Sequence, residues 1–156
     1  MKTYHLTAIL LILLIAGCQT KSREKVPKSS SPENLGLRFI NDYIQSIGKM
    51  EMVEWIEQNP STTQNFKSSL RSLVENAEKE TPGYGLGFDP ILDAQDYPDR
   101  GFDLKSIDTN TGYVAVVGKD WKDFELTIKL IYFEGKWLVD GSGIVNIPQE
   151  KQAPRD

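Results

Sequence analysis

The spacing of apolar residues changes once along this chain, and that change limits the possible folds more than any other feature. Between residues 32 and 80 the apolar residues recur at spacings of three and four, which is typical of helices that bury one face. From residue 103 to 145 they alternate with polar residues, which is typical of half-buried strands. Helices that precede strands without interleaving predict an α+β fold and not a parallel doubly wound one.

Local capping signals divide the first half of the chain into three expected helices. Ser31 is placed as the N-cap of the first helix, Pro32 stands in its first turn, and Gly48 is placed to end it. Ser61 and Gln64 have the spacing of a capping box and are expected to open the third helix. A short second helix is expected over 50–57, and the third is expected to end at 81–83.

A long irregular segment and then four strands are expected in the second half. Residues 83–101 are rich in Gly, Pro, Asp and aromatic residues, which predicts an ordered loop, and loops of this length are uncommon unless they are functional. The last two strands are expected to be joined by a tight turn at Glu134 and Gly135, with Trp137 in the core. The expected strands are 103–108, 112–119, 124–133 and 136–145.

Three segments carry a resemblance to a known bacterial family. They are Phe-Ile-Asn-Asp-Tyr-Ile (39–44), Gly-Phe-Asp-Pro-Ile-Leu-Asp-Ala-Gln-Asp-Tyr-Pro-Asp (87–99) and Gly-Lys-Trp-Leu-Val-Asp (135–140). Over about residues 35–145 the chain resembles domain of unknown function 3828, which is typical of secreted or lipid-anchored bacterial proteins. The order of its elements resembles the nuclear transport factor 2-like, or cystatin-like, roll. The resemblance implies N-terminal helices packed on a curved antiparallel sheet of about four strands, and it implies no reaction and no catalytic residues.

The N-terminus has the pattern of a secretion signal that ends at a cysteine. A charged start is followed by the apolar run 6–16, which is shorter than the roughly 20 residues of a membrane-spanning helix. Ile15, Ala16 and Gly17 before Cys18 resemble the bacterial lipobox, which the lipoprotein signal peptidase recognises. The resemblance implies cleavage after Gly17 and lipidation of Cys18, which would supply the membrane anchor. The alternative is an ordinary secretion signal with a cysteine near its cleavage site by chance.

These observations divide the chain into four expected segments. They are a signal peptide (1–17), a lipidated cysteine with a flexible basic tether (18–31), one globular domain (32–147) and a frayed polar tail (148–156). Gln19 follows the cysteine where an inner-membrane lipoprotein often has Asp, so the periplasmic face of the outer membrane is the expected location in the cell envelope. After loss of Lys2 the mature chain keeps 17 basic and 22 acidic residues, a net charge of −5, which argues against binding nucleic acid.

The residue types present exclude several common chemistries. The only histidine, His5, lies within the expected signal peptide, and the only cysteine, Cys18, is expected to carry lipid. The mature domain therefore lacks the groups for Ser-His-Asp or Cys-His catalysis and for the usual zinc sites. It also has no Gly-rich phosphate-binding loop. No catalytic residue, metal or cofactor is expected.

A group of aspartates in and just after the long loop is a candidate carboxylate or calcium site. The spacing does not match a calcium loop, because Ile91 stands where a second oxygen ligand belongs. Structural roles suit the pattern better, with Asp89 forming a turn before Pro90 and Asp93 or Asp96 capping backbone amides. The group comprises Asp89, Asp93, Asp96, Asp99 and Asp103.

The candidate contacts for a ligand or partner are the polar and aromatic residues around that loop. They are Asp93, Gln95, Asp96, Tyr97 and Trp121, chosen because polar tips on apolar bodies suit ligand contact. We expect a non-catalytic, membrane-anchored binding module for a protein partner or a small ligand. The alternatives are an immunity protein against a periplasmic toxin, a purely structural protein, or an enzyme using carboxylates in the cavity of the roll. The enzyme would require a closed pocket holding a carboxylate whose pKa is raised by burial.

Overall fold

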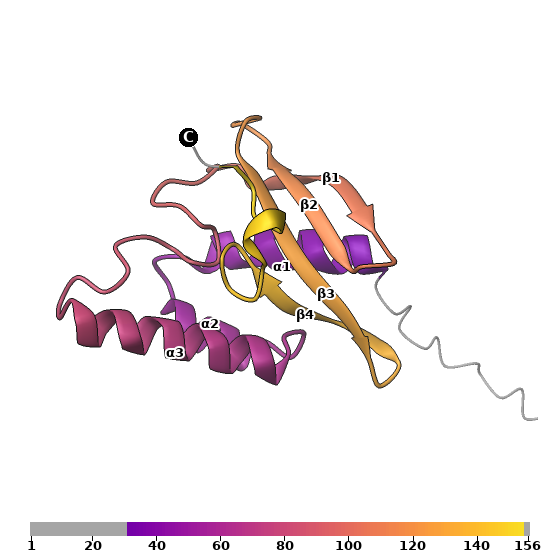
Figure 1. The fold of residues 1–156 in the computed structure, drawn as a ribbon. Helices are drawn as coiled ribbons and strands as arrows, with labels where there is room; N and C mark the ends of the chain where they lie inside the picture. The colour runs from indigo at the N-terminus through magenta and orange to yellow at the C-terminus, as the bar shows by residue number, and fades with distance from the viewer. Residues whose placement is uncertain (1–30, 155–156) are drawn as a thin grey trace, which may run out of the picture.

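The computed structural model describes residues 31–154, and the expected signal peptide and Cys18 lie outside this part of the chain. Three helices precede four strands (Figure 1), which confirms the α+β prediction. The elements are α1 (Pro32–Ser46), α2 (Met52–Gln58), α3 (Gln64–Glu80), β1 (Phe102–Asp108), β2 (Tyr113–Gly118), β3 (Glu125–Phe133), β4 (Lys136–Ser142) and the short 3-10 helix η1 (Gln149–Lys151).

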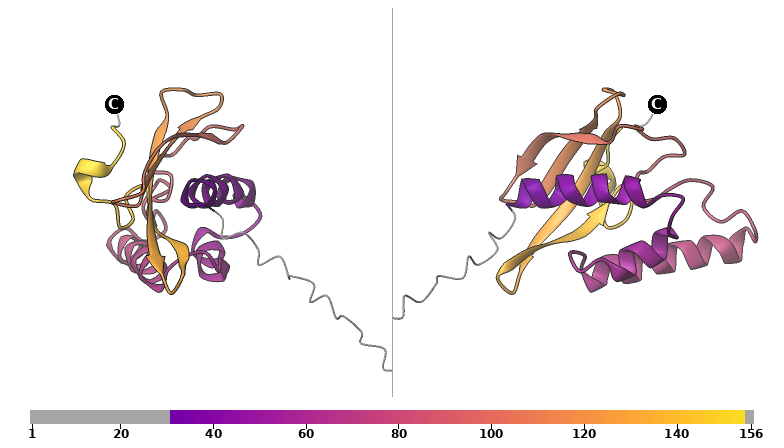
Figure 2. Two further views of the ribbon diagram at one scale, coloured as in Figure 1. Left: turned by 90° about the vertical axis from the view of Figure 1, so that its right-hand side faces the viewer. Right: turned by 180° about the vertical axis from the view of Figure 1, so that it is seen from behind.

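The four strands form one antiparallel sheet in the order of the sequence, β1-β2-β3-β4. The sheet is curved and does not close into a barrel (Figures 1 and 2). Helix α1 crosses one face and contacts all four strands, whereas α3 contacts α2 and β4. The predicted arrangement of N-terminal helices on a curved antiparallel sheet is therefore confirmed.

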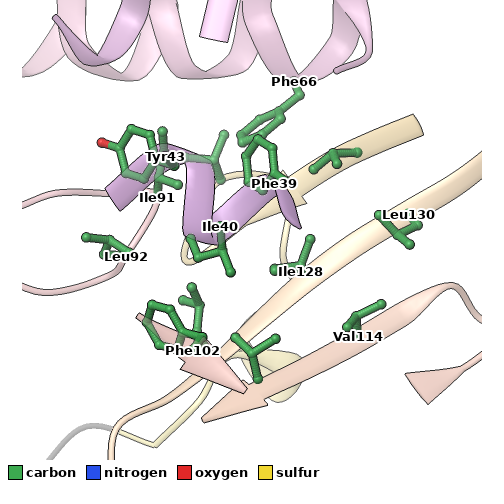
Figure 3. Packing of buried hydrophobic residues seen from close by; sticks show 14 of the residues in the cluster. Phe39, Ile40, Tyr43, Phe66, Ile91, Leu92, Phe102, Val114, Ile128 and Leu130 are labelled. Carbon is green, nitrogen blue, oxygen red and sulfur yellow. The ribbon is translucent and has the colours of Figure 1, made fainter. Parts of the chain in front are cut away.

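The core lies between α1 and the sheet (Figure 3). Phe124, just before β3, and the alternate residues of β3 from Leu126 to Leu130 are buried, as the alternation predicts. Gly36 lets α1 approach the sheet closely, because a Cβ there would lie 3.2 Å from the side chain of Val114. Trp55 on α2 completes the core beside α1, with its ring centroid 5.4 Å from that of Phe39 and 5.1 Å from that of Tyr43.

Helix α1 begins and ends where predicted, with Ser31 at the N-cap position and its carbonyl accepting a hydrogen bond from the Leu35 amide at 2.9 Å. Ser31 makes no capping hydrogen bond with its side chain, so the N-terminal turn relies on Pro32, whose fixed backbone suits the first turn. After the last helical residue, Gly48 has a φ of 76°, the left-handed conformation that commonly ends a helix. The predictions for Gly48 and for the N-cap position of Ser31 are confirmed, but the side chain of Ser31 makes no capping hydrogen bond.

Helix α3 begins later than the sequence predicts, at Gln64 with Thr63 as the N-cap. The Oγ1 atom of Thr63 accepts a hydrogen bond from the Phe66 amide at 3.0 Å. Ser61 does not serve as the N-cap, because its carbonyl accepts a hydrogen bond from the Val139 amide of β4 at 2.8 Å. Pairing with the sheet therefore overrides the predicted capping box of Ser61 and Gln64.

Two bulges and one tight turn shape the sheet. Lys105 is the extra residue of edge strand β1, and Asp140 is the extra residue of β4. Asp140 accepts a hydrogen bond from the Thr63 hydroxyl at 2.6 Å, which joins β4 to the start of α3. The tight turn at Glu134 and Gly135 is confirmed by their φ values of 48° and 81°.

The C-terminal end of the domain differs from the prediction. β4 ends at Ser142, and Val145 forms only an isolated pairing with Ser142. The stretch expected to be a frayed tail contains η1, and the side-chain amide of Gln152 donates a hydrogen bond to the Ile147 carbonyl at 2.9 Å. The sequence showed only the polar composition of this stretch.

Candidate functional site

The molecule has two distinct ends along the axis of α1 (Figures 1 and 2). The first, which we call the hairpin end, holds the start of α1 at Pro32, the β1–β2 turn and the β3–β4 turn. The second, the loop end, holds the end of α1, the loop 81–101 and the β2–β3 turn. Because α1 has 15 residues that each rise about 1.5 Å, its own two ends are about 22 Å apart.

Asp89 organises the loop at the loop end. Its backbone pairs with Ala94 through hydrogen bonds of 2.9 and 3.2 Å, which close a four-residue turn. Its Oδ1 atom also accepts hydrogen bonds from the amides of Ile91 at 2.8 Å and Leu92 at 3.1 Å. The predicted role of Asp89 as a turn former is confirmed, and Asp93 takes part in the same turn with a φ of 55°.

The other oxygen of Asp89 accepts a hydrogen bond from the hydroxyl of Tyr43 on α1. Burial is the largest cause that raises the pKa of Asp89, and the hydrogen bonds from Tyr43, Leu92 and Ile91 lower it by less. Burial, together with the charge of Asp89, also raises the pKa of Tyr43 well above its usual range. Tyr43 therefore stays protonated as a donor, and the pair ties the loop to the helix.

This pair stands at the edge of a cavity of about 560 Å³ at the end of α1. The cavity is bordered by the segment 47–52 and by Glu54, Phe88 and the Tyr43–Asp89 pair. Sequence reasoning placed no site here, because Tyr43 fits the apolar stripe of its helix. The hydroxyl was the available signal, since a buried tyrosine usually needs a polar partner.

Three of the predicted contact residues meet at a second cavity, of about 350 Å³. Gln95 and Asp96 come from the loop, and Trp121 comes from the β2–β3 turn. Gln95 is held by a hydrogen bond from its side-chain amide to the Gly87 carbonyl at 2.9 Å, and the Trp121 ring meets that of Phe124 edge-on at 5.2 Å. The remaining lining residues are Ala94, Asp123, Phe124 and Pro154.

The other two predicted contacts lie elsewhere. Asp93 is a turn residue, and Tyr97 is half-buried against the core; neither lines the second cavity. Tyr97 lies near enough to Tyr43 for its charge to affect the pKa of Tyr43. Local sequence grouped five residues, but the fold divides them between a turn, the core and a cavity.

The described part of the chain does not bring the aspartates together as ligands. Within residues 31–154 no three His, Cys, Asp or Glu side chains are grouped to hold a metal ion. Asp96 and Asp99 are exposed, and Asp103 pairs with Lys122 at 3.4 Å. Over the same residues, no helix has both the length and the apolar character that crossing a bilayer requires.

What the site can do chemically follows from how its groups are used. Asp89, the carboxylate with the raised pKa, already accepts three hydrogen bonds from the protein, so it fixes backbone rather than presenting a free base. The second cavity instead presents an exposed carboxylate at Asp96 and a half-exposed indole at Trp121. These groups can accept hydrogen bonds and provide apolar contact.

Comparison with known proteins identifies no relative: no family model, no curated protein and no solved structure matches the chain. The resemblance to domain of unknown function 3828 and to the nuclear transport factor 2-like roll therefore stays a prediction.

Proposed function

We propose that this protein is a lipid-anchored, non-catalytic binding protein of the bacterial cell envelope. The lipid on Cys18 holds the protein to a membrane, which we propose is the outer membrane. The loop end of the domain binds a protein partner. The single observation that carries the proposal is the position of the two cavities. Both lie at the end of the domain opposite to Pro32, where the chain leading from Cys18 enters the fold.

The proposed anchor is supported by the sequence before the domain. Ile15, Ala16 and Gly17 precede the only cysteine of the chain, directly after an apolar run. A secreted chain with one cysteine cannot form an internal disulfide, so lipidation gives that thiol a role. Acyl chains contribute about 0.8 kcal/mol for each buried CH₂ group, and two or more chains anchor a protein stably.

Charge supports a partner with a basic surface. Residues 31–154 contain 12 basic and 20 acidic residues, a net charge of −8, and the loop 81–101 has four aspartates against Arg100 alone. Opposite charge on a partner would speed association and help to select the partner. An immunity protein facing a basic toxin would be one such case.

The anchor is tested by the mass of the mature protein. We expect the native N-terminus to be Cys18 with attached acyl chains, and we expect Cys18→Ala to move the protein from the membrane to the soluble fraction. An unmodified polypeptide that starts at any other residue, or that still contains Met1, would overturn the anchor.

The binding end is tested by quantitative capture from solubilised membranes with the full chain as bait. We expect one partner to be recovered, and Trp121→Ala to reduce its recovery strongly, since a central tryptophan contributes about 2 kcal/mol or more, about thirtyfold in affinity. Tyr84→Ala is the matched control, because Tyr84 is an 87% exposed aromatic residue of the loop 81–101 that lies outside both cavities. Equal recovery with all three baits would contradict the proposed site.

A further inference from the structure

The tip of the β3–β4 hairpin projects beyond the rest of the sheet (Figures 1 and 2). β2 pairs with β3 as far as Lys129, and the Leu130 amide donates a last hydrogen bond to the Gly112 carbonyl just before β2 at 2.7 Å. The next residues of β3, Ile131 to Phe133, pair with β4 alone, opposite Leu138 to Lys136. The tip is thus a two-stranded ribbon whose side chains have no cover from another strand.

Large aromatic side chains are exposed on this tip. Tyr132 is 61% exposed and Phe133 is 54% exposed. Trp137, which the sequence placed in the core, packs against the core cluster but is only half-buried, and its ring meets that of Tyr132 edge-on at 5.3 Å. Among residues 31–154, Tyr132 and Phe133 are the only large hydrophobic residues that are both exposed and adjacent in sequence. Successive residues of a strand face opposite sides, so Tyr132 lies with Trp137 on one face of the ribbon and Phe133 lies on the other. Exposed apolar surface at a projecting tip is typical of an interaction site.

The start of α1 lies at the same end of the molecule as this tip (Figures 1 and 2). Cys18 precedes Pro32 by fourteen residues, so the chain between them can reach at most about 50 Å. If Cys18 carries lipid, the hairpin end is held within that distance of the bilayer. Such confinement raises the effective concentration of the tip at the membrane, so a weak contact is enough.

We propose that the tip of the β3–β4 hairpin, formed by Tyr132, Phe133, Lys136 and Trp137, rests in the headgroup region of the bilayer that holds Cys18. The proposal depends on the lipid anchor proposed above. It gives the chain a second membrane contact and directs the loop end away from the lipid.

The chemistry of the tip suits a bilayer surface. Tyrosine and tryptophan are enriched at membrane interfaces, where an apolar ring meets a polar headgroup. Residues 131–138 contain one acidic and one basic residue, Glu134 and Lys136, so the tip is neutral while the whole domain is acidic. The segment that precedes the domain, residues 19–30, is basic, with four Lys or Arg residues against Glu24. The tip itself therefore carries no net charge that an anionic surface would repel.

The experiment measures quenching of tryptophan fluorescence by bromine on the lipid chains. The lipidated full chain is reconstituted in vesicles of phosphatidylethanolamine and phosphatidylglycerol, with and without bromine near the headgroup. We expect quenching in the wild type and in Trp121→Phe, and its loss in Trp137→Phe. Trp121 is the matched control, because it is 46% exposed but lies at the loop end.

A second variant tests the contact while keeping Trp137 in place as the reporter, although it removes the Tyr132 ring that meets Trp137. Its quenching is therefore compared with that of Phe133→Ser alone, which leaves that ring contact intact. Tyr132→Ser with Phe133→Ser changes two exposed side chains, so we expect the fold, measured by its circular dichroism and melting temperature, to persist. We expect the variant to float with the vesicles as the wild type does, because the acyl chains remain. The quenching of Trp137 is expected to fall at least fivefold.

The outcomes separate the two proposals. Protein that does not float with vesicles would overturn the lipid anchor, and the docked hairpin with it. Protein that floats while its Trp137 emission is not quenched would overturn the docked hairpin alone. A wild-type dimer that Phe133→Ser dissociates, with no quenching, would assign the tip to a second copy of this chain instead.

Discussion

Tyr43 and Asp89 are 46 positions apart in the chain, yet each satisfies the polar group of the other. Tyr43 is 2% exposed, and its hydroxyl lies at the edge of the core beside the loop that carries Ile91 and Leu92 (Figure 3). A buried hydroxyl or carboxylate without a partner costs about 1–3 kcal/mol or more. This one hydrogen bond therefore couples the stability of the loop to that of α1.

Removing that hydroxyl should weaken the protein in a way that depends on pH. Tyr43→Phe is expected to lower the free energy of unfolding by about 1.5–3 kcal/mol at pH 7, because the buried carboxyl group of Asp89 loses a hydrogen-bond donor. Because Tyr43 lowers the pKa of Asp89, the variant should raise that pKa further above its ordinary value of 3.8. Urea unfolding at a series of pH values measures both effects.

Whether stability rises or falls with pH depends on which state, folded or unfolded, binds the proton of Asp89 more tightly. In the folded protein the pKa of Asp89 is raised, so its contribution to stability is greatest below pH 3.8 and falls as pH rises through the folded pKa. The fall is larger in Tyr43→Phe, so the difference between variant and wild type should grow with pH over this window. A difference that stays constant or shrinks with rising pH would contradict the assigned hydrogen bond.

Among the elements, α1 and β1 are linked by the hydrogen bonds of one side chain, that of Asn41, in addition to their packing in the core. Its Nδ2 donates to the Leu37 carbonyl at 2.9 Å and to the Phe102 carbonyl at 3.2 Å, and its Oδ1 accepts from the Phe102 amide at 2.8 Å. Gly101 has to be glycine beside it, since a Cβ there would lie 2.2 Å from the Oδ1 of Asn41.

Asn41→Ala should therefore loosen the start of β1. We expect a loss of about 2 kcal/mol, because the buried peptide groups of Phe102 lose their partners. Hydrogen exchange at the Phe102 amide should accelerate more than at β3 amides such as Ile128, which keep their sheet pairing. Uniform acceleration across the sheet would contradict a local role.

The β3–β4 turn is another place where one residue decides the behaviour of an element. Both turn residues have positive φ, as a type I′ turn requires, but Glu134 adopts that conformation less readily than asparagine. Glu134→Asn should stabilise the fold by about 0.5 kcal/mol, a typical gain for a compatible turn substitution. Thermal unfolding measures the gain, and a lower melting temperature would contradict the assigned turn.

Periodicity predicted the kind and order of the elements because burial of one face is visible in a local window. The local sequence did not show where a residue would form hydrogen bonds with a distant strand instead of with its neighbours in the chain. Three consecutive residues, Ser61, Thr62 and Thr63, can all cap a helix, and pairing with Val139 decides that Thr63 does.

The candidate site was predicted only in part, because the local sequence does not show which distant segments meet in the fold. Composition singled out the loop, and Gln95, Asp96 and Trp121 do meet there. Nothing in the local sequence showed that Asp93 would be used as a turn residue or that Tyr97 would pack on the core. The cavity beside Tyr43 was missed because it forms from segments far apart in the chain.

For the whole molecule, the two-ended arrangement predicts an orientation at the membrane. Asn110→Cys and Lys119→Cys place labels beyond opposite ends of β2, whose six residues span about 20 Å. On the lipid-anchored protein, energy transfer from the label to acceptors in the bilayer should be stronger from position 110. Equal transfer from both positions would show that the domain has no fixed orientation.

The bulge in β1 has a consequence for how copies of this protein share a surface. An open strand edge offers unpaired peptide groups to any neighbouring chain. In β1 the extra residue is Lys105, which forms an ion pair with Glu125, and exposed Asp103 adds a second charge on the same strand. A neighbouring strand would meet an interrupted, charged edge, so crowded molecules can stay separate rather than grow into a shared sheet.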